Sequence, residues 1–318
     1  MKTSKKNESM RPVKKNIKKK LGKYKFVYLL AVPGFIYLII NNYMPMVGLI
    51  LAFKNYNFAQ GIFKSPWCGL SNFTYLFSSK WAKIMFRNTI GYNLVFIIFG
   101  TAFAIFVAIL LGEVKNARAK KIYQTFILIP YLVSMVLVGY LVFAFLSNAN
   151  GFINKGILEK LGKEGISWYT KPEYWPFILT IVNLWKGFGF QSIVFYETII
   201  GFDKTYYEAA VVDGASVWKQ ITRITLPLLR PTVIILTIMS LGRMFNSDFG
   251  LFYQVPMNTG TLYTATTTID TFVYRAMMED HDVGRSLAAG FLQSVLGFAV
   301  VLITNMIVRK VEPDSALF

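Results

Sequence analysis

The residues whose types and spacing suit a specific interaction lie in a polar interruption, 202–227, between two long apolar segments. Asp203 is a suitable N-cap, and Gly214 supplies the left-handed backbone that a helix C′ position favours. Together they predict a helix over 204–213, a rod about 15 Å long. Glu208 would present a hydrogen-bond acceptor at a fixed place on this rod, which suits docking to another protein.

A second helical piece is predicted after this turn, over about 215–225. Its apolar residues Trp218, Ile221 and Ile224 recur at helical spacing, so we expect them to be buried. Pro227 is expected to end the piece, because proline lacks the N–H that a helix interior needs.

The order Glu-Ala-Ala, Asp-Gly-Ala and Leu-Pro within 202–227 resembles the EAA loop of ABC-importer membrane subunits. In that family the short helix is a coupling helix, which docks into a cleft on a separate ATPase subunit. The resemblance implies that the ATPase-coupling residues are Tyr207, Glu208, Ala209, Ala210, Asp213, Gly214, Ala215, Leu226 and Pro227. The alternative is an ordinary amphipathic helix at the membrane surface, on which Glu208 is merely solvated.

The sequence contains no recognisable motif for catalysis or metal binding. The single histidine, His281, lies in the acidic run 279–282, whose adjacent residues do not converge readily on one ion. One histidine facing outside also leaves no hydroxyl–imidazole–carboxylate set. The segment 156–163 has one residue too many between its glycines for a phosphate-binding loop, and Glu164 stands where a hydroxyl should follow. We therefore expect neither an enzyme nor a nucleotide site on this chain.

Polar side chains inside predicted membrane spans are the other candidates for function. Lys186 lies near the middle of one apolar segment and Arg243 in another, and such charges are costly unless they face a cavity or a partner. Sugar rings have flat C–H faces that stack on aromatic rings, and hydroxyls that bond to amides, carboxylates and guanidinium groups. The candidate substrate path therefore comprises Trp185, Lys186, Phe188, Gln191, Arg243, Asn246, Asp248, Phe249 and Tyr253.

Two interpretations of the two cations stay open from the sequence. Lys186 and Arg243 either contact the substrate or take part in polar pairing between helices, with the aromatic residues packed against lipid or a second membrane subunit. If both line the path, acidic sugars become attractive as cargo.

The composition indicates a membrane protein. The 318 residues are 54% hydrophobic, with a mean hydropathy of +0.46, and only 16% of them are charged, a combination that is rare in soluble domains. Of the 34 Lys and Arg residues, 21 lie in 1–25, 113–122, 202–230 and 309–310, which alternate with the other loops. This bias predicts that both termini and the 202–227 loop are cytoplasmic, and it disfavours nucleic acid as the partner of a chain with net charge +18.

We expect an all-α integral membrane fold with six transmembrane helices of 20 or more residues. A basic cytoplasmic tail over 1–25, held near lipid headgroups, precedes a transmembrane permease domain over 26–310, and 311–318 is a C-terminal tail. Pro130 is expected to bend the third span. The predicted spans are about 26–47, 88–112, 123–146, 175–199, 231–253 and 286–308.

Five short motifs lie outside the loop: Tyr43-Met44-Pro45, Phe53-Lys54-Asn55-Tyr56, Ser65-Pro66-Trp67-Cys68-Gly69-Leu70, Trp185-Lys186 and Asp270-Thr271-Phe272-Val273-Tyr274-Arg275. They resemble the LplB-like branch of carbohydrate ABC permeases, relatives of MalF, although that branch usually has valine where Cys68 stands. The resemblance covers roughly 26–310 and implies a type I ABC importer permease fold in a bacterial plasma membrane.

The same resemblance implies the partners. Such importers pair this kind of chain with a second permease subunit in a heterodimer, with two ATP-binding subunits that carry ATP and Mg, and with an extracellular solute-binding lipoprotein that delivers an oligosaccharide. No cofactor is expected on this chain itself. The alternatives are an importer of a non-sugar solute, such as a peptide or amino acid, and a permease-fold membrane sensor or scaffold.

Overall fold

The computed structural model describes residues 24–311 and is helical in that range, with no strand beyond an isolated bridge between Lys54 and Trp67. The predicted all-α fold is therefore confirmed for the described part of the chain. The predicted tails, 1–25 and 311–318, lie almost wholly outside it. The chain divides into two compact units, residues 1–50 and 51–318.

The first unit is continuously helical over its described part. It comprises α2 (Lys25–Leu38), the π-helical turn η1 (Ile39–Tyr43), α3 (Met44–Met46) and the start of the 3₁₀ helix η2 (Val47–Phe53). The apolar stretch Tyr28–Phe53 is long enough to cross a membrane, and it runs past the predicted end of span one at 47.

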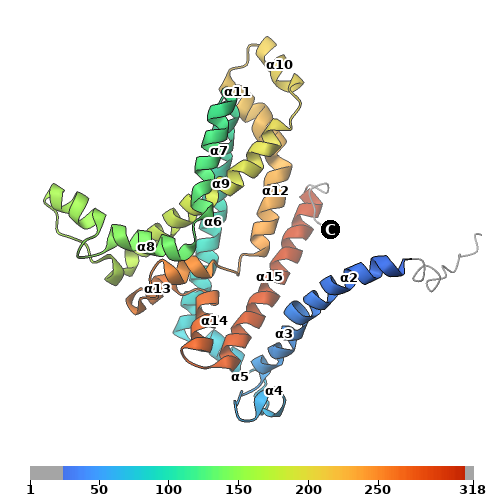
Figure 1. Cartoon of the computed structure of the whole chain (residues 1–318), viewed down its shortest axis with the longest axis vertical. Helices are drawn as coiled ribbons and strands as arrows, with labels where there is room; N and C mark the ends of the chain where they lie inside the picture. Colours follow the sequence, from blue (N-terminus) through green and yellow to red (C-terminus); the bar gives the residue numbers. More distant parts are fainter. Residues whose placement is uncertain (1–23, 312–318) are drawn as a thin grey trace, which may run out of the picture. The chain divides into compact units, whose positions relative to one another are not determined.

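The second unit is a bundle around the long helices α6 (Lys80–Glu113), α9 (Trp175–Ile200) and α15 (Val283–Val311) (Figure 1). Its other α-helices are α4 (Gly61–Lys64), α5 (Ser71–Ser78), α7 (Ala117–Leu132), α8 (Met135–Leu146), α10 (Thr205–Val212), α11 (Val217–Gln220), α12 (Leu226–Gly242), α13 (Tyr263–Thr266) and α14 (Ile269–Met278). Its π-helical and 3₁₀ turns are η3 (Phe152–Leu158), η4 (Glu159–Leu161), η5 (Trp168–Thr170), η6 (Pro172–Tyr174), η7 (Ile221–Thr225), η8 (Gly250–Gln254) and η9 (Gly260–Leu262).

Five described helical stretches are long and apolar enough to span a membrane, and α7 with α8 makes a sixth if the bent pair counts as one span. Six predicted spans agree with that count. Helix α6 begins at Lys80 rather than near 88, because the Ser79 hydroxyl accepts a hydrogen bond from the Ala82 N–H and caps it.

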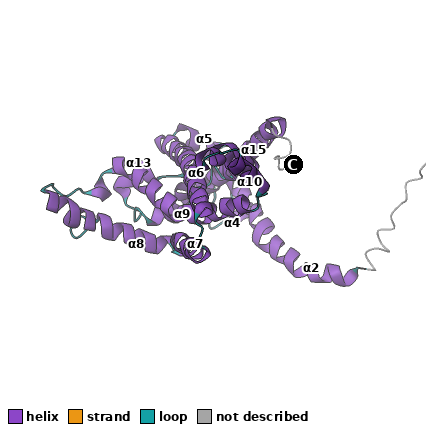
Figure 2. Cartoon of the chain, turned by 90° about the horizontal axis from the view of Figure 1, so that it is seen from above, coloured by secondary structure: helices purple, strands orange, loops and turns teal. Residues whose placement is uncertain are grey.

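The third span is broken rather than gently bent. Helices α7 and α8 meet at 92°, and α7 ends at Leu132, two residues after Pro130. The Ser134 hydroxyl accepts a hydrogen bond from the Leu137 N–H and so starts α8 afresh. Both views show α8 leaving the bundle sideways (Figures 1 and 2).

The fifth span differs most from its prediction. The helix runs from Val217 to Gly242 through α11, η7 and α12, whereas the sequence predicts a span over 231–253. The prediction that Pro227 ends the preceding helical piece is wrong. Pro227 lies in the first turn of α12, directly after the π-helical turn. A missing N–H costs little in a first turn. Beyond Gly242 the backbone is irregular up to the start of η8.

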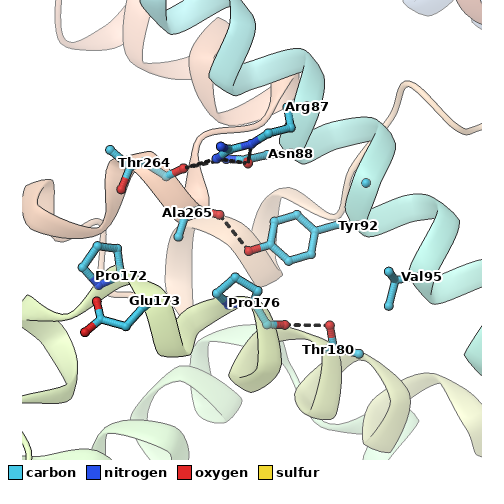
Figure 3. Close-up of a pocket in the computed structure, with 11 residues that line it drawn as sticks. Arg87, Asn88, Tyr92, Val95, Pro172, Glu173, Pro176, Thr180, Thr264 and Ala265 are labelled. Carbon is cyan, nitrogen blue, oxygen red and sulfur yellow. Dashed lines mark hydrogen bonds between the residues drawn. The ribbon is translucent and has the colours of Figure 1, made fainter.

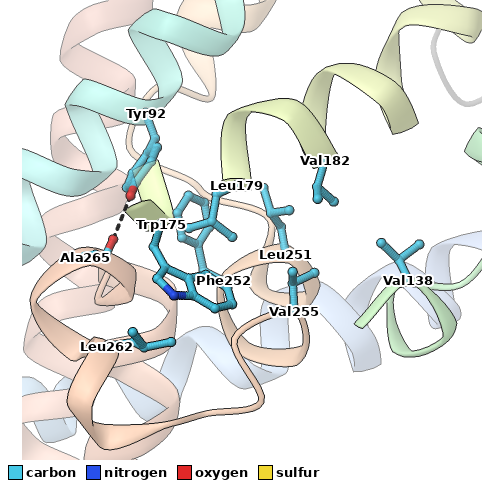
Figure 4. Packing of buried hydrophobic residues seen from close by; sticks show 10 residues of the cluster. All are labelled: Tyr92, Val138, Trp175, Leu179, Val182, Leu251, Phe252, Val255, Leu262 and Ala265. Carbon is cyan, nitrogen blue, oxygen red and sulfur yellow. Dashed lines mark hydrogen bonds between the residues drawn. The ribbon is translucent and has the colours of Figure 1, made fainter. Parts of the chain in front are cut away.

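Helix α6 contributes to all three apolar clusters of the second unit. The first cluster joins α6, α8, α9, η8 and α13 around the fully buried Trp175 (Figure 4). The Trp175 indole donates to the Trp168 carbonyl at 2.8 Å, which satisfies its polar atom inside the cluster. Helix α10 lies at one end of the bundle of long helices, and α13 and α14 lie toward the other end (Figure 1).

Candidate functional site

The EAA loop, residues 202–227, begins with a turn before helix α10, whose N-cap is Lys204 and not the expected Asp203. The Asp203 carboxylate accepts a hydrogen bond from the Thr205 N–H at 3.0 Å. The hydrogen bonds from the Thr205 backbone and then its side chain lower the pKa of Asp203 below its usual value. Helix α10 is eight residues long, shorter than the ten expected, because Lys204 and Asp213 occupy its caps.

Gly214 ends the helix in the way that the sequence predicts. It adopts φ +72°, a left-handed conformation that residues with a side chain rarely take. The following N–H, of Ala215, donates to the Ala210 carbonyl at 2.8 Å and closes the turn. The direction in which the chain leaves α10 therefore depends on this glycine.

Helix α10 buries none of its side chains within this chain. Tyr206, Val211 and Val212 are 56%, 63% and 88% exposed, and Glu208 is exposed beside them. Trp218, which we expected to be buried, is 73% exposed, because helical spacing places residues on one face without saying whether another element covers that face. Exposed apolar groups clustered around an acidic residue favour a protein partner.

One hydroxyl pair joins α10 to the long helix behind it. The Tyr207 and Thr225 hydroxyls lie 3.0 Å apart, and Thr225 is buried at the end of η7. A cavity of about 520 Å³ lies behind this contact and is lined by both residues. Leu226 and Pro227 follow at once in the first turn of α12. The predicted coupling residues thus occupy one loop, and their contact with an ATPase stays a prediction.

A polar cavity of about 530 Å³ lies among α6, α9 and the end of α12. It brings together four residues of the predicted substrate path: Gln191, Arg243, Asn246 and Asp248. The full lining is Asn93, Phe96, Ile97, Thr101, Asn183, Gln191, Ser240, Arg243, Asn246, Ser247 and Asp248.

Amide side chains from two long helices hold the irregular segment that forms one wall. The Asn93 amide of α6 donates to the carbonyls of Met244 and Asn246 at 3.0 and 3.1 Å. The Gln293 amide of α15 donates to the Phe245 carbonyl at 2.9 Å and to the Asn246 side-chain oxygen at 3.0 Å. These bonds satisfy backbone groups that a helix would otherwise satisfy, which irregular backbone within a membrane protein requires.

Asp270, at the start of α14, completes this support. One carboxylate oxygen accepts bonds from the Ser247 N–H and hydroxyl at 2.6 and 2.7 Å. The other accepts a bond from the Gln293 amide at 3.1 Å. The Ser247 wall is therefore fixed from α6, α14 and α15.

Arg243 and Asp248 are the charged residues on the cavity wall, and both are exposed. The sequence predicts Arg243 inside a span, but in the structure it directly follows α12. There its N–H donates to the Ser240 carbonyl. Within residues 24–311 its guanidinium makes no hydrogen bond or ion pair. Asp248 accepts a hydrogen bond from the Leu251 N–H at 3.1 Å and thereby caps η8.

Lys186 is not on this wall, contrary to its assignment to the substrate path. Its ammonium group donates to the carbonyls of Pro130 and Tyr131 at 3.3 and 3.0 Å, and to the Val133 carbonyl. These oxygens lie at the end of α7, where the helix break leaves the Tyr131 and Val133 carbonyls without intrahelical partners and the Pro130 carbonyl with the Val133 N–H at 3.3 Å. The cation therefore serves the 92° bend.

The predicted aromatic residues also lie outside the cavity lining. Phe188 packs against Phe103 of α6 with ring centroids 5.2 Å apart, and Trp185 is 40% exposed away from the cavity. Phe249 stacks on Tyr253 at 4.8 Å, and both contact Tyr274 of α14. Phe188 lies three residues before Gln191 and so shares its helix face, but its ring packs against Phe103 and is not part of the cavity lining.

Sequence reasoning missed several polar residues of the site. Those on the long helices could have been found as amide or hydroxyl groups inside long apolar runs, which are rare enough to be informative. The missed residues are Asn93, Thr101, Asn183, Ser240, Ser247, Asp270 and Gln293.

A second cavity, of about 660 Å³, lies between α6, α9 and α13 (Figure 3). Most of its polar groups are already engaged, since Tyr92 donates to the Ala265 carbonyl, and Arg87 and Asn88 donate to the Thr264 carbonyl, while Glu173 on its wall is exposed. It therefore has less to offer a hydroxyl-rich solute than the polar cavity. In the described part of the chain no three His, Cys, Asp or Glu residues are grouped to hold a metal.

Comparison with known proteins agrees with this arrangement. A family model described as "Binding-protein-dependent transport system inner membrane component" matches residues 100–313. Protein LplB of Bacillus subtilis (strain 168) is 32% identical over 93% of this chain and 92% of its own length.

Two solved structures match closely. A chain of a bacterial ABC transporter involved in the import of the acidic polysaccharide alginate has a TM-score of 0.85 and 31% identity, covering 94% of this chain and 100% of that one. A chain of a bacterial alginate ABC transporter in complex with an alginate pentasaccharide-bound periplasmic protein has a TM-score of 0.83 and 31% identity, covering 92% and 97%.

The family model spans more than half of the chain, and the relative of 32% identity covers nearly all of it. Both agree with long apolar helices around a polar cavity. The chain therefore belongs to the binding-protein-dependent transport system inner membrane components, as a permease subunit of a bacterial plasma-membrane ABC transporter and not an enzyme.

Proposed function

We propose that this chain forms one half of the translocation pathway of an ATP-driven importer for an oligosaccharide, and that the EAA loop transmits the work of a partner ATPase. One observation carries the proposal. A single helix, Val217–Gly242, joins the exposed EAA loop to the wall of the polar cavity. A force that passes from α10 through the Tyr207–Thr225 contact reaches Arg243 along this one continuous helix.

The cavity lining favours a hydroxyl-rich solute. Side-chain amides, hydroxyls and two charged groups face it, and together they donate and accept hydrogen bonds as sugar hydroxyls require. The structural relatives support the same cargo class, since one is involved in the import of alginate and another is bound to a pentasaccharide-loaded periplasmic protein. An extracellular solute-binding lipoprotein therefore delivers the cargo.

The remaining proposed partners are a second permease and the ATPase subunits. A second permease subunit forms the other half of the pathway, and two ATP-binding subunits, carrying ATP and Mg, receive α10 and its counterpart. The excess of Lys and Arg around the EAA loop supports a cytoplasmic location for it and for both termini. Closure of the ATPase pair pushes α10, and the Tyr207–Thr225 contact passes this movement to α12.

Replacement of Gly214 tests the coupling role. Gly214→Val adds a side chain at φ +72°, so the chain must leave α10 in a different direction. In proteoliposomes with the cognate ATPase, second permease and binding protein, we expect ATP hydrolysis to continue while uptake of labelled oligosaccharide falls at least tenfold.

Gly162→Val is the matched control. Gly162 has φ +69° and, like Gly214, open space around the added group, but it lies in the loop between η4 and η5. Uptake should stay near the unsubstituted level in this variant. Normal coupled uptake by Gly214→Val would contradict the role of the loop, and ATP-dependent uptake of peptides or amino acids alone would favour a non-sugar importer. ATPase stimulation without uptake of any solute would favour a sensor.

A further inference from the structure

Arg243 is the one cation on the wall of the polar cavity, and the described chain leaves it unpaired. Its guanidinium has five N–H donors, none of which meets an acceptor within residues 24–311. Lys186, the other cation of the predicted substrate path, has three carbonyl partners. Arg243 is therefore available to something that this chain does not supply.

Asp248 and Asp270, the carboxylates on or bonded to the segment after α12, accept hydrogen bonds from other groups of this chain. Asp270 accepts bonds from Ser247 and Gln293 with its two oxygens, and Asp248 caps η8 through the Leu251 N–H. Neither forms an ion pair with Arg243 in the described part of the chain. The rest of the polar lining is made of neutral amides and hydroxyls.

The depth of Arg243 along the bundle favours a partner for its charge. Its neighbour Asn246 bonds to Gln293, which lies ten residues into α15, roughly 15 Å along that helix. The segment after α12 thus lies well along the bundle from the start of α15, and cations at such depth face water, a cavity or an anion. The cavity provides the water, and an incoming anion would provide the partner.

We propose that Arg243 binds a carboxylate of the transported saccharide, so that the importer takes oligosaccharides containing uronic acid residues. A guanidinium grips a carboxylate through two parallel N–H···O bonds, which a sugar hydroxyl cannot match. Asn183, Gln191 and Asn246 are placed to bond to the hydroxyls of the same ring. This inference rests on the proposed function, because it requires the polar cavity to be the cargo path.

The test uses the complete transporter in proteoliposomes with ATP and Mg inside and the cognate binding protein outside. The probes are trimers of galacturonate, mannuronate and guluronate, each paired with its carboxyl-reduced neutral counterpart, together with maltotriose and arabinotriose. We expect ATP-dependent uptake of at least one acidic trimer, at least tenfold more efficient than that of its neutral counterpart. Uptake confined to neutral trimers overturns the inference and leaves the proposed function standing. Uptake of none of the probes overturns both.

Variants separate recognition from folding. Arg243→Gln should raise the KM for the transported acidic trimer at least tenfold more than the KM for a neutral trimer, whereas Arg243→Lys should show a smaller difference between the two. Lys163→Gln removes an exposed cation from the loop between η4 and η5 and should change neither value. Equal loss for acidic and neutral trimers, or failure of Arg243→Gln to assemble with the second permease, would show that Arg243 pairs with a subunit and would overturn the inference.

Discussion

Lys186 and Arg243 place a cation inside the same helix bundle under opposite conditions. Lys186 extends from the middle of α9 to the broken end of α7, where three carbonyls surround its ammonium group. Arg243 follows the last residue of α12 and faces a cavity without a partner in the described chain. A charge at a helix break stabilises the fold, and a charge at a helix end beside a cavity is free for a ligand. The comparison predicts that changes at Lys186 lower stability, whereas changes at Arg243 lower transport.

The contact that brings α9 against α7 is the most sensitive point. A Cβ on Gly189 would lie 1.8 Å from the Ile127 carbonyl oxygen, so Gly189→Ala must push the helices apart and pull Lys186 away from its carbonyls. We expect a loss of about 3 kcal/mol or more in unfolding free energy, measured by denaturant titration of the purified complex in detergent. Gly187→Ala, on the same helix with open space at its Cβ, should be neutral. Equal stability of the two variants would refute the close contact.

Removing the cation at the break should come next in size. Lys186→Met keeps much of the side-chain volume but removes the donor from the Tyr131 and Val133 carbonyls, whereas the Pro130 carbonyl keeps the Val133 N–H. We expect a loss of about 2 kcal/mol, because unsatisfied polar groups cost that much each when they are well buried, and these are only partly so. A variant that unfolds like the unsubstituted protein yet fails to transport would return Lys186 to the substrate path.

The support behind the cavity wall should matter less. Asp270→Asn turns one acceptor oxygen into a donor that faces the Ser247 N–H or the Gln293 amide. We expect a loss of about 1 kcal/mol in unfolding free energy together with weaker uptake. Asp280→Asn, an exposed acidic residue after the same helix, serves as the control and should change neither quantity.

The smallest effect on stability is expected at Arg243. Arg243→Gln removes no bond within the described chain, so the unfolding free energy should change by less than about 0.5 kcal/mol. Differential unfolding of this variant beside Lys186→Met checks the contrast directly. A large loss at Arg243 would mean that both cations are structural.

The EAA loop could be predicted from the sequence because its features are local. Asp203 accepts a hydrogen bond from the Thr205 N–H just before α10, and Gly214 adopts the conformation that a helix end requires. The cavity depends on segments far apart in the sequence. Hydropathy treats Lys186 and Arg243 alike, since only the end of α12 and the break after Pro130 distinguish their surroundings. The exposed Trp218 shows the same limit, because the partner that would cover it is not encoded in the spacing.

The π-helical turn η7 has a consequence for how the long helix is oriented. A π turn holds about one more residue than an α turn, so it offsets every later side chain by about 100° around the axis. Deleting one residue within Ile221–Thr225 would therefore rotate α12 and carry Arg243 out of its wall without shortening the helix by a full turn. The direction in which Arg243 points around the helix axis is thus set about 20 residues earlier in the chain, near the end of the EAA loop.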